Sequence, residues 1–343
     1  RAKGKTRPGA APIADQIGAA IDDALQQASL SADDITAVGV AIPGVVDTAT
    51  GHIIKVPNLE IGDPLLVESL RRRYELPITM GNDVNLGTLA ECWLGAGRGA
   101  QDAVGIFVGT GIGGGVVIGG RLRTGPEDLA GEIGHMVLQV DGPRCNCGNL
   151  GCFEALASRN AIERDIRAAL QAGRQSSIVQ HVEEGERIRS GDLKAALDEG
   201  DELVTEVLTR AAHYLGQGVL TVRHLLDPEL IIFGGGVIEA CGDFLMPLIE
   251  QELRADGMRG SRNVLRLVVS ELGDDAVALG AAACARAEIS GLSLADFEAS
   301  RLEEAVACAG SDYPTVEALE FGAVVVAGER VEYDIHIRAD GRV

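Results

Sequence analysis

The sequence predicts an α/β protein built from two lobes. Near the start, an amphipathic helix over residues 12 to 30 precedes a buried strand at Ile35–Ile42. A further strand at Leu76–Met80 then precedes a helix at Val84–Leu94. Such alternation is typical of a mainly parallel sheet. From Asp102 onward a glycine-rich pair of strands interrupts the pattern before a second alternating region begins.

The second region has longer helices than the first. Its apolar spacing predicts helices at 159–171, 192–199 and 202–226, strands at Leu230–Phe233 and Leu265–Val269, and an alanine-rich helix at 275–289. Residues 291–343 differ from the preceding region: they contain two further predicted strands, Ala323–Val326 and Val331–Ile337, and no visible cluster of catalytic residues. We expect two lobes with a cleft between them, followed by an appended or incomplete module.

Composition places the chain among ordinary globular proteins. It has 343 residues, of which 46% are hydrophobic and 24% charged. Its longest apolar stretch, Ala103–Ile118, is interrupted by glycines and is shorter than the roughly 18 residues that a membrane helix needs. Residues Arg1 to Pro12 lack the apolar core of a secretory signal. We therefore expect a cytoplasmic protein without a membrane partner.

Charge and cysteine usage exclude two further classes. The net charge of −21 repels phosphate backbones, so we expect no nucleic-acid partner. The seven cysteines are an odd number, and three of them lie within eight residues. This clustering favours metal binding in a reducing compartment over a disulfide framework.

The clustered cysteines predict a zinc site. Cys145, Cys147 and Cys152 are separated by glycine-containing turns, and His135 lies ten residues upstream of the first. Three thiolates and one imidazole satisfy tetrahedral zinc. The alternative is a set of small core cysteines with a surface histidine, which this close spacing disfavours. Four protein ligands leave no position for water, so the predicted zinc is structural.

Two glycine-rich turns are candidate phosphate- or nucleotide-binding elements. The run Gly109–Gly115 follows a strand, where its backbone N–H groups could converge on phosphate oxygens. Its spacing is neither a Walker motif nor a dinucleotide fingerprint, and a tight structural hairpin explains it equally well. Gly234–Gly236 ends a strand, where it could admit a flat ligand or serve packing alone.

Polar side chains at a strand end are the candidate catalytic group. Asn82 and Asp83 follow the strand at Leu76–Met80, and α/β enzymes place chemistry at such ends. An Asn-Asp pair also serves as a helix cap, so the pair alone does not decide. Glu132 and Glu154 flank the predicted zinc loop.

Taken together, these segments resemble the ordered signature of the ROK family (repressors, open reading frames, kinases), from about residue 10 to 288. The segments that carry the resemblance are Ala41–Gly44, Pro57–Leu59, Asn82–Asn85, Gly109–Gly115, Ala130–His135 and the cysteine loop through Glu154.

The resemblance implies an actin-like, ribonuclease H-like ATPase fold with the zinc loop at the cleft between the lobes. Residues 1–95 would be a remnant of the smaller lobe and residues 96–290 the larger lobe, with the last helix, 275–289, packing back on the first lobe. The implied activity is phosphorylation of a hexose by ATP and Mg²⁺ at the 6-hydroxyl, with glucose as the first candidate.

The family pattern also assigns site residues. Asp83 would be the base that takes the proton of the sugar hydroxyl. The implied sugar-binding residues are Gly44, Asn58, Asn82, Asp83, Glu132, His135 and Glu154. Gly109, Thr110 and Gly111 would cradle phosphates, and Gly234, Gly235 and Gly236 would lie near the nucleoside.

The chain departs from the family pattern in one respect. Family members open with an Asp-x-Gly-x-Thr phosphate loop, which this sequence does not contain. We expect that the sequence is truncated, and that the chain as written binds hexose but transfers phosphate poorly. The tail at 324–343 could instead replace the missing strands, although the start of an unrelated small domain fits its sequence better.

The alternatives are a sugar-responsive transcriptional repressor of the same family and an N-acetylhexosamine kinase. Residues 1–11 are too few for a helix-turn-helix, and the negative charge opposes DNA binding. The sugar-binding set is shared among glucose and the N-acetylhexosamines, so the sequence does not select between them. The resemblance also implies a homodimer or a higher homo-oligomer.

Overall fold

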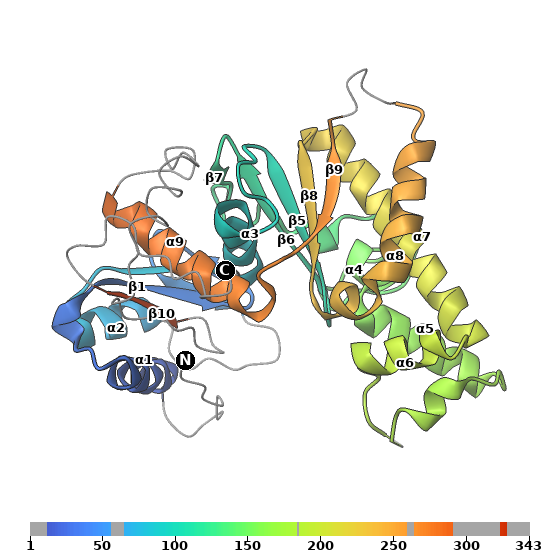
Figure 1. Ribbon diagram of the computed structural model, residues 1–343, viewed down its shortest axis with the longest axis horizontal. Helices are drawn as coiled ribbons and strands as arrows, with labels where there is room; N and C mark the ends of the chain where they lie inside the picture. Colours follow the sequence, from blue (N-terminus) through green and yellow to red (C-terminus); the bar gives the residue numbers. More distant parts are fainter. Residues whose placement is uncertain (1–11, 56–64, 184, 259–263, 291–322, 328–343) are drawn as a thin grey trace, which may run out of the picture. The chain divides into compact units, whose positions relative to one another are not determined.

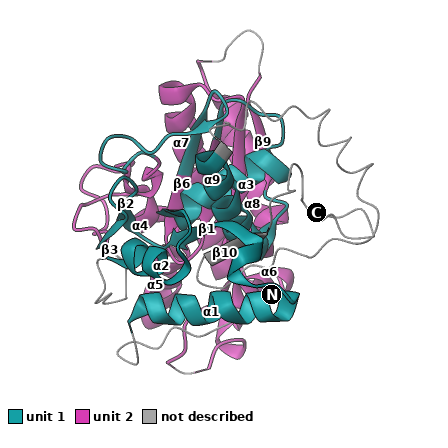
Figure 2. Ribbon diagram, turned by 90° about the vertical axis from the view of Figure 1, so that its left-hand side faces the viewer, with its two compact units in different colours: residues 1–103, 115–130, 270–343 teal, residues 104–114, 131–269 magenta. Residues whose placement is uncertain are grey.

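The computed structural model describes residues 12–55, 65–183, 185–258, 264–290 and the strand 323–327 (Figure 1). The chain divides into two compact units, which are coloured separately in Figure 2. Unit 1 contains residues 1–103, 115–130 and 270–343, and unit 2 contains residues 104–114 and 131–269. Each unit therefore combines segments that are distant in sequence.

Unit 1 is built on a three-stranded sheet with the order β10-β1-β4. Strand β1 (Ile35–Ile42) pairs in parallel with β4 (Ile78–Asn82) and antiparallel with β10 (Ala323–Ala327). Segment 323–327, expected in an appended module, therefore belongs to the first sheet. The other predicted tail strand, Val331–Ile337, lies outside the described residues. Strands β2 (Val45–Asp47) and β3 (His52–Lys55) form a separate antiparallel pair.

Helices α1 (Ile13–Ala28) and α2 (Leu66–Tyr74) pack together in unit 1. The apolar stripe of α1, which includes Ile17 and Ile21, is buried in one core with residues of β1 and β4. At the edge of this core the Tyr74 hydroxyl donates to Gly18 O at 2.8 Å and to an Asp22 carboxylate oxygen at 2.7 Å. The sequence periodicity thus predicts the buried face of α1 correctly.

Helix α3 (Asp83–Leu94) packs against the alanine-rich α9 (Ala276–Ser290), which also contacts β1. Glu91 of α3 is fully buried, and its carboxylate accepts hydrogen bonds from three backbone N–H groups. Ala96 N donates to Oε2 at 2.9 Å, while Glu271 N and Leu272 N donate to Oε1 at 3.0 and 2.9 Å. These hydrogen bonds satisfy the buried charge and hold the end of α3 to the segment that leads into α9.

The second sheet has the strand order β7-β6-β5-β8-β9. Its strands are β5 (Ala103–Val108), β6 (Ile112–Ile118), β7 (Arg121–Leu122), β8 (Leu230–Gly234) and β9 (Arg266–Val269). Strands β8 and β9 are parallel, whereas β6 and β7 are antiparallel. The protein therefore contains mixed sheets. Antiparallel β7 lies in the glycine-rich region that was predicted to form a hairpin, whereas antiparallel β10 joins a sheet that was predicted to be mainly parallel.

Unit 2 also contains several α-helices, of which α8 packs against β8 and β9. The helices are α4 (Phe153–Ala157), α5 (Arg159–Gln171), α6 (Ser190–Asp198), α7 (Glu202–Leu226) and α8 (Gly236–Ala255). Asp201 caps α7 by accepting a 2.9 Å hydrogen bond from Val204 N. Short 3-10 turns occur at Ala32–Asp34, Ile133–His135, Ser177–Gln180 and Gly273–Asp275. None of the described helices combines the length and the apolar character needed to cross a membrane.

Candidate functional site

The structure brings the four predicted zinc ligands together in unit 2. The ligand atoms of His135, Cys145, Cys147 and Cys152 all lie within 4.8 Å of one another. The sulfur atoms of Cys147 and Cys152 are 3.7 Å apart, and Cys145 Sγ is 3.7 Å from His135 Nδ1. Zn–S bonds of about 2.3 Å place two thiolates of a tetrahedral site about 3.8 Å apart. The donor set and its spacing therefore fit a zinc ion.

The loop closes around the cysteines through backbone hydrogen bonds. Cys145 N donates to Asn149 O at 2.8 Å and Gly148 N donates to Cys145 O at 3.0 Å, so the chain turns sharply between the thiols. Burial raises the pKa of Cys145 to about 12 and also raises the pKa of Cys152. Because a zinc ligand must be a thiolate, binding of the metal releases protons.

The orientation of His135 separates its two ring nitrogens. Nδ1 faces the cysteine cluster, whereas Nε2 lies 3.8 Å from Oε2 of Glu132. Glu132 precedes the 3-10 turn that carries His135, and both side chains are about one-third exposed, at 36% and 35%. One nitrogen is thus available to a metal and the other lies beside an accessible carboxylate.

Glu154 links the cysteine loop to the glycine-rich turn. Its Oε2 accepts a 3.0 Å hydrogen bond from Ile112 N, and its Oε1 lies 3.5 Å from Cys145 Sγ. A Cβ atom on Gly111 would stand 2.2 Å from Glu154 Oε2. A side chain at 111 would therefore displace this carboxylate from Ile112 N, which is a reason for glycine that the sequence pattern alone does not reveal.

The turn Gly109–Thr110–Gly111 lies against the start of α5. Arg159 N donates to Gly109 O at 2.9 Å, and Asn160 N donates to Thr110 O at 3.4 Å. In a trans peptide the carbonyl and the following N–H point in opposite directions. The N–H groups of Thr110 and Gly111 therefore point away from α5, as the predicted phosphate cradle requires.

The glycine run is divided differently from the prediction. The sequence pattern predicts a turn over all of Gly109–Gly115, whereas β6 already begins at Ile112. Gly235 has a φ of 84°, and a Cβ there would stand 2.8 Å from Val108 O. Close packing of the β8–α8 turn against β5 therefore explains Gly235 without a ligand, and the roles of Gly234 and Gly236 near a nucleoside stay predictions.

Asn82 and Asp83 lie at the junction of β4 and α3 in unit 1. The Asn82 side-chain oxygen caps α3 by accepting from Val84 N at 2.9 Å and from Asn85 N at 3.0 Å. Its amide group donates to Gly44 O at 2.9 Å, which joins two of the predicted sugar-binding residues. Half-buried Asp83 is the first residue of the helix, and Asn58 lies outside the described residues.

Comparison with known proteins shows which family the chain belongs to. The family model described as "ROK family" matches residues 3–288. The chain belongs to the ROK family. A glucokinase from Halalkalibacterium halodurans is 33% identical over 79% of this chain and 82% of its own length. The DNA-binding transcriptional dual regulator NagC from Escherichia coli is 32% identical over 76% of this chain and 63% of its own.

A solved ROK structure supports the same assignment. The ROK family glucokinase from Streptomyces griseus, in complex with glucose and AMPPNP, is 31% identical to this ROK protein. The match covers 82% of this chain and 89% of that chain, with a TM-score of 0.70. The α/β fold of the family is thereby shown, and the cluster of His135 and three cysteines is consistent with the ROK zinc motif.

Sequence reasoning missed Arg159 at the glycine-rich turn. Its guanidinium donates to the Thr110 hydroxyl at 3.0 Å. The only local signal is the preceding Ser158, whose side chain accepts from Ala161 N at 3.2 Å and caps α5. No spacing rule relates residue 159 to residue 110, so the contact is visible only in the folded chain.

Proposed function

We propose that this ROK protein is a sugar kinase that transfers a phosphoryl group from ATP to the 6-hydroxyl of a hexose, with glucose as the first candidate. The observation that carries the proposal is Asp83, a half-buried carboxylate placed at the first turn of α3 by the Asn82 cap. A sugar sensor needs hydroxyl-binding groups, but only phosphoryl transfer needs a base.

Asp83 would accept the proton of the sugar hydroxyl as the oxygen attacks the γ-phosphate. ATP enters as its Mg²⁺ complex, which neutralises charge on the phosphates. Thr110 and Gly111 would bind phosphate oxygens through the N–H groups that point away from α5. Positioning and electrostatic stabilisation supply most of the rate in such reactions.

The remaining predicted residues would bind the sugar. Glu132 and the Nε2 atom of His135 are accessible and lie 3.8 Å apart, so both could contact neighbouring hydroxyls. Zinc held at the Nδ1 side would fix the orientation and tautomer of the ring, which is a structural role. Gly44, Asn58, Asn82 and Glu154 complete the proposed sugar-binding set.

The second candidate is a sugar-responsive repressor, because NagC is about as similar to this chain as the glucokinase is. A net charge of −21 favours the kinase, since DNA repels an acidic surface. Two further questions are whether the phosphoryl donor is ATP or polyphosphate and which hexose or N-acetylhexosamine is the substrate. One assay can answer both.

The decisive experiment assays the product of the complete gene with ATP or polyphosphate and a panel of glucose, N-acetylglucosamine and N-acetylmannosamine. Formation of a 6-phosphate with one of these sugars supports the kinase. Binding of promoter DNA that a sugar reverses, together with no phosphoryl transfer to any sugar, would favour the repressor instead.

A further inference from the structure

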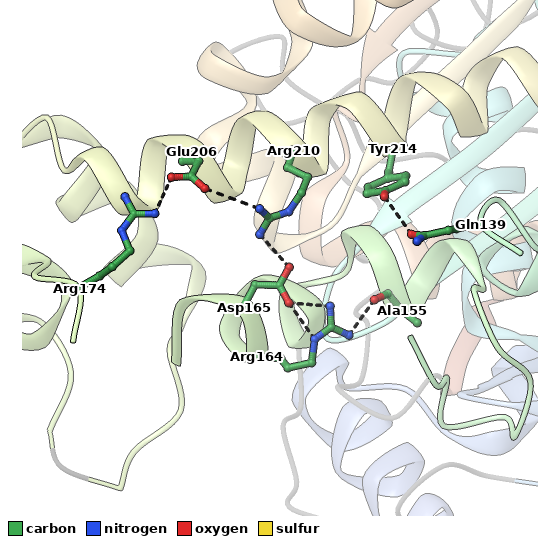
Figure 3. A network of polar contacts seen from close by, with 8 residues as sticks. All are labelled: Gln139, Ala155, Arg164, Asp165, Arg174, Glu206, Arg210 and Tyr214. Carbon is green, nitrogen blue, oxygen red and sulfur yellow. Dashed lines mark hydrogen bonds and ion pairs between the residues drawn. The ribbon is translucent and has the colours of Figure 1, made fainter. Parts of the chain in front are cut away.

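The Arg159–Thr110 contact places an unneutralised cation at the glycine-rich turn. Several arginines of unit 2 are paired with carboxylates: Arg174 with Glu206, Arg210 with Asp165, and Arg164 with Asp165 (Figure 3). Among the described residues, no carboxylate pairs with Arg159. In a chain with a net charge of −21, an unpaired guanidinium beside a turn with outward N–H groups favours an anion there.

The contact also determines what the Thr110 hydroxyl can do. A guanidinium has only donors, so the 3.0 Å hydrogen bond from Arg159 Nη2 requires Thr110 Oγ1 to accept. The hydroxyl retains its own proton, for which the described part of the chain provides no acceptor. Thr110 is exposed, so an incoming ligand can supply that acceptor.

The start of α5 is not itself the anion site. Its first two N–H groups, those of Arg159 and Asn160, donate to the carbonyls of Gly109 and Thr110. The third, Ala161 N, donates to the capping hydroxyl of Ser158. The N–H groups at the start of the helix are therefore already used to hold the turn, and the groups left to contact an anion belong to the turn itself.

We propose that Arg159 is a positioning residue for the phosphoryl donor: it holds the Thr110 hydroxyl as an acceptor, which directs the hydroxyl proton to a phosphate oxygen of the nucleotide. This inference rests on the proposed kinase function, since it assigns the ligand of the turn as a nucleoside triphosphate. It adds a residue that the sequence signature does not contain.

The test is a double-mutant cycle measured by nucleotide binding. AMPPNP with Mg²⁺ is titrated calorimetrically into the product of the complete gene and its variants Arg159→Met, Thr110→Val and the double mutant. A hydrogen bond to a charged group corresponds to roughly 10- to 100-fold in affinity, so each single variant should weaken nucleotide binding by about 10-fold or more. The double mutant should be little weaker than Thr110→Val alone, because Arg159 acts through that hydroxyl.

Three further measurements separate positioning from a general structural effect. Glucose affinity and melting temperature should be unchanged in Arg159→Met, and Arg159→Lys should recover part of the nucleotide affinity because it can still donate to Thr110. The control Arg174→Met removes an arginine whose partner is Glu206 and should leave both affinities unchanged.

Two results would overturn the inference while leaving the kinase intact. They are full nucleotide affinity in Arg159→Met, and losses that add in the double mutant, which would indicate independent contacts. A wild-type protein that binds no nucleotide would instead contradict both the inference and the kinase proposal.

Discussion

Glu154 and Ile112 are joined by a 3.0 Å hydrogen bond in which the backbone N–H of Ile112 donates to the carboxylate. Because Glu154 directly follows Phe153 at the start of α4, this bond connects the cysteine loop to the first residue of β6. The segment that would hold zinc and the turn that would hold phosphate are thus positioned by one side chain.

Replacement of Glu154 should affect sugar binding and local structure together. Glu154→Ala removes the acceptor of Ile112 N and the proposed sugar contact, so the dissociation constant for glucose should rise by about 10-fold or more. Glu154→Gln retains an acceptor oxygen and should lower the melting temperature less than Ala does. Calorimetry and thermal unfolding measure both effects. Unchanged glucose affinity in a zinc-loaded Glu154→Ala protein would refute the sugar-binding role.

Removal of a cysteine from the cluster should release the metal. We expect about one zinc per chain in the wild type, and Cys147→Ser should lose it and melt at a lower temperature, because a structural site contributes to folding. The control is Cys241→Ala, which removes a buried thiol on α8 outside the cluster. Metal analysis that finds no zinc in wild-type protein, or equal zinc in both variants, would contradict the assignment.

Asp83→Asn should separate catalysis from binding. The amide is nearly isosteric and can still hydrogen-bond a sugar hydroxyl, but it cannot accept the proton at neutral pH. Turnover should therefore fall by about 100-fold or more while glucose affinity changes little. Steady-state kinetics and calorimetry on the same preparation check both parts. An Asn variant with wild-type turnover would exclude Asp83 as the base.

Glu91 should be among the most stability-sensitive charged residues of unit 1. Glu91→Ala leaves the N–H groups of Ala96, Glu271 and Leu272 without their acceptor inside a buried site, which should cost about 3 kcal/mol or more of unfolding free energy. The matched control is Glu68→Ala, since Glu68 forms an exposed ion pair with Arg72, and this substitution should cost less than about 1 kcal/mol. Urea unfolding compares the two, and equal losses would show that the Glu91 contacts contribute little.

Asp201 should make unit 2 sensitive to acid. Burial tends to raise its pKa, but hydrogen bonds from Val204 N, Ser176 Oγ and Ser177 N outweigh burial and lower it below the ordinary value of 3.8. A lowered folded pKa contributes stability above the unfolded pKa that is lost as pH falls through the folded one. The stability advantage of wild type over Asp201→Asn should therefore be constant near neutral pH and shrink below about pH 4. Thermal unfolding from pH 7 to pH 3 measures this difference, and an advantage that does not shrink in acid would contradict the assignment.

Short-range patterns in the sequence correctly predicted most of the regular elements. The apolar periodicity located α1, β1, α5 and α7 within a few residues, because each element buries one repeating face. The clustering of the proposed zinc ligands was also predictable, since Cys145, Cys147 and Cys152 occupy one tight loop whose geometry depends on local turns. Contacts between residues that are close in sequence can be predicted without knowing the rest of the fold.

Contacts between distant segments required the tertiary structure. The pairing of β10 with β1, the Glu91 hydrogen bonds to residues 271 and 272, and the Arg159–Thr110 contact each join positions separated by tens to hundreds of residues. Periodicity reports which face of an element is buried but not which partner covers it. Buried backbone N–H and C=O groups need hydrogen-bond partners. Which distant residue supplies each partner depends on how the chain folds, so these contacts are visible only in the tertiary structure.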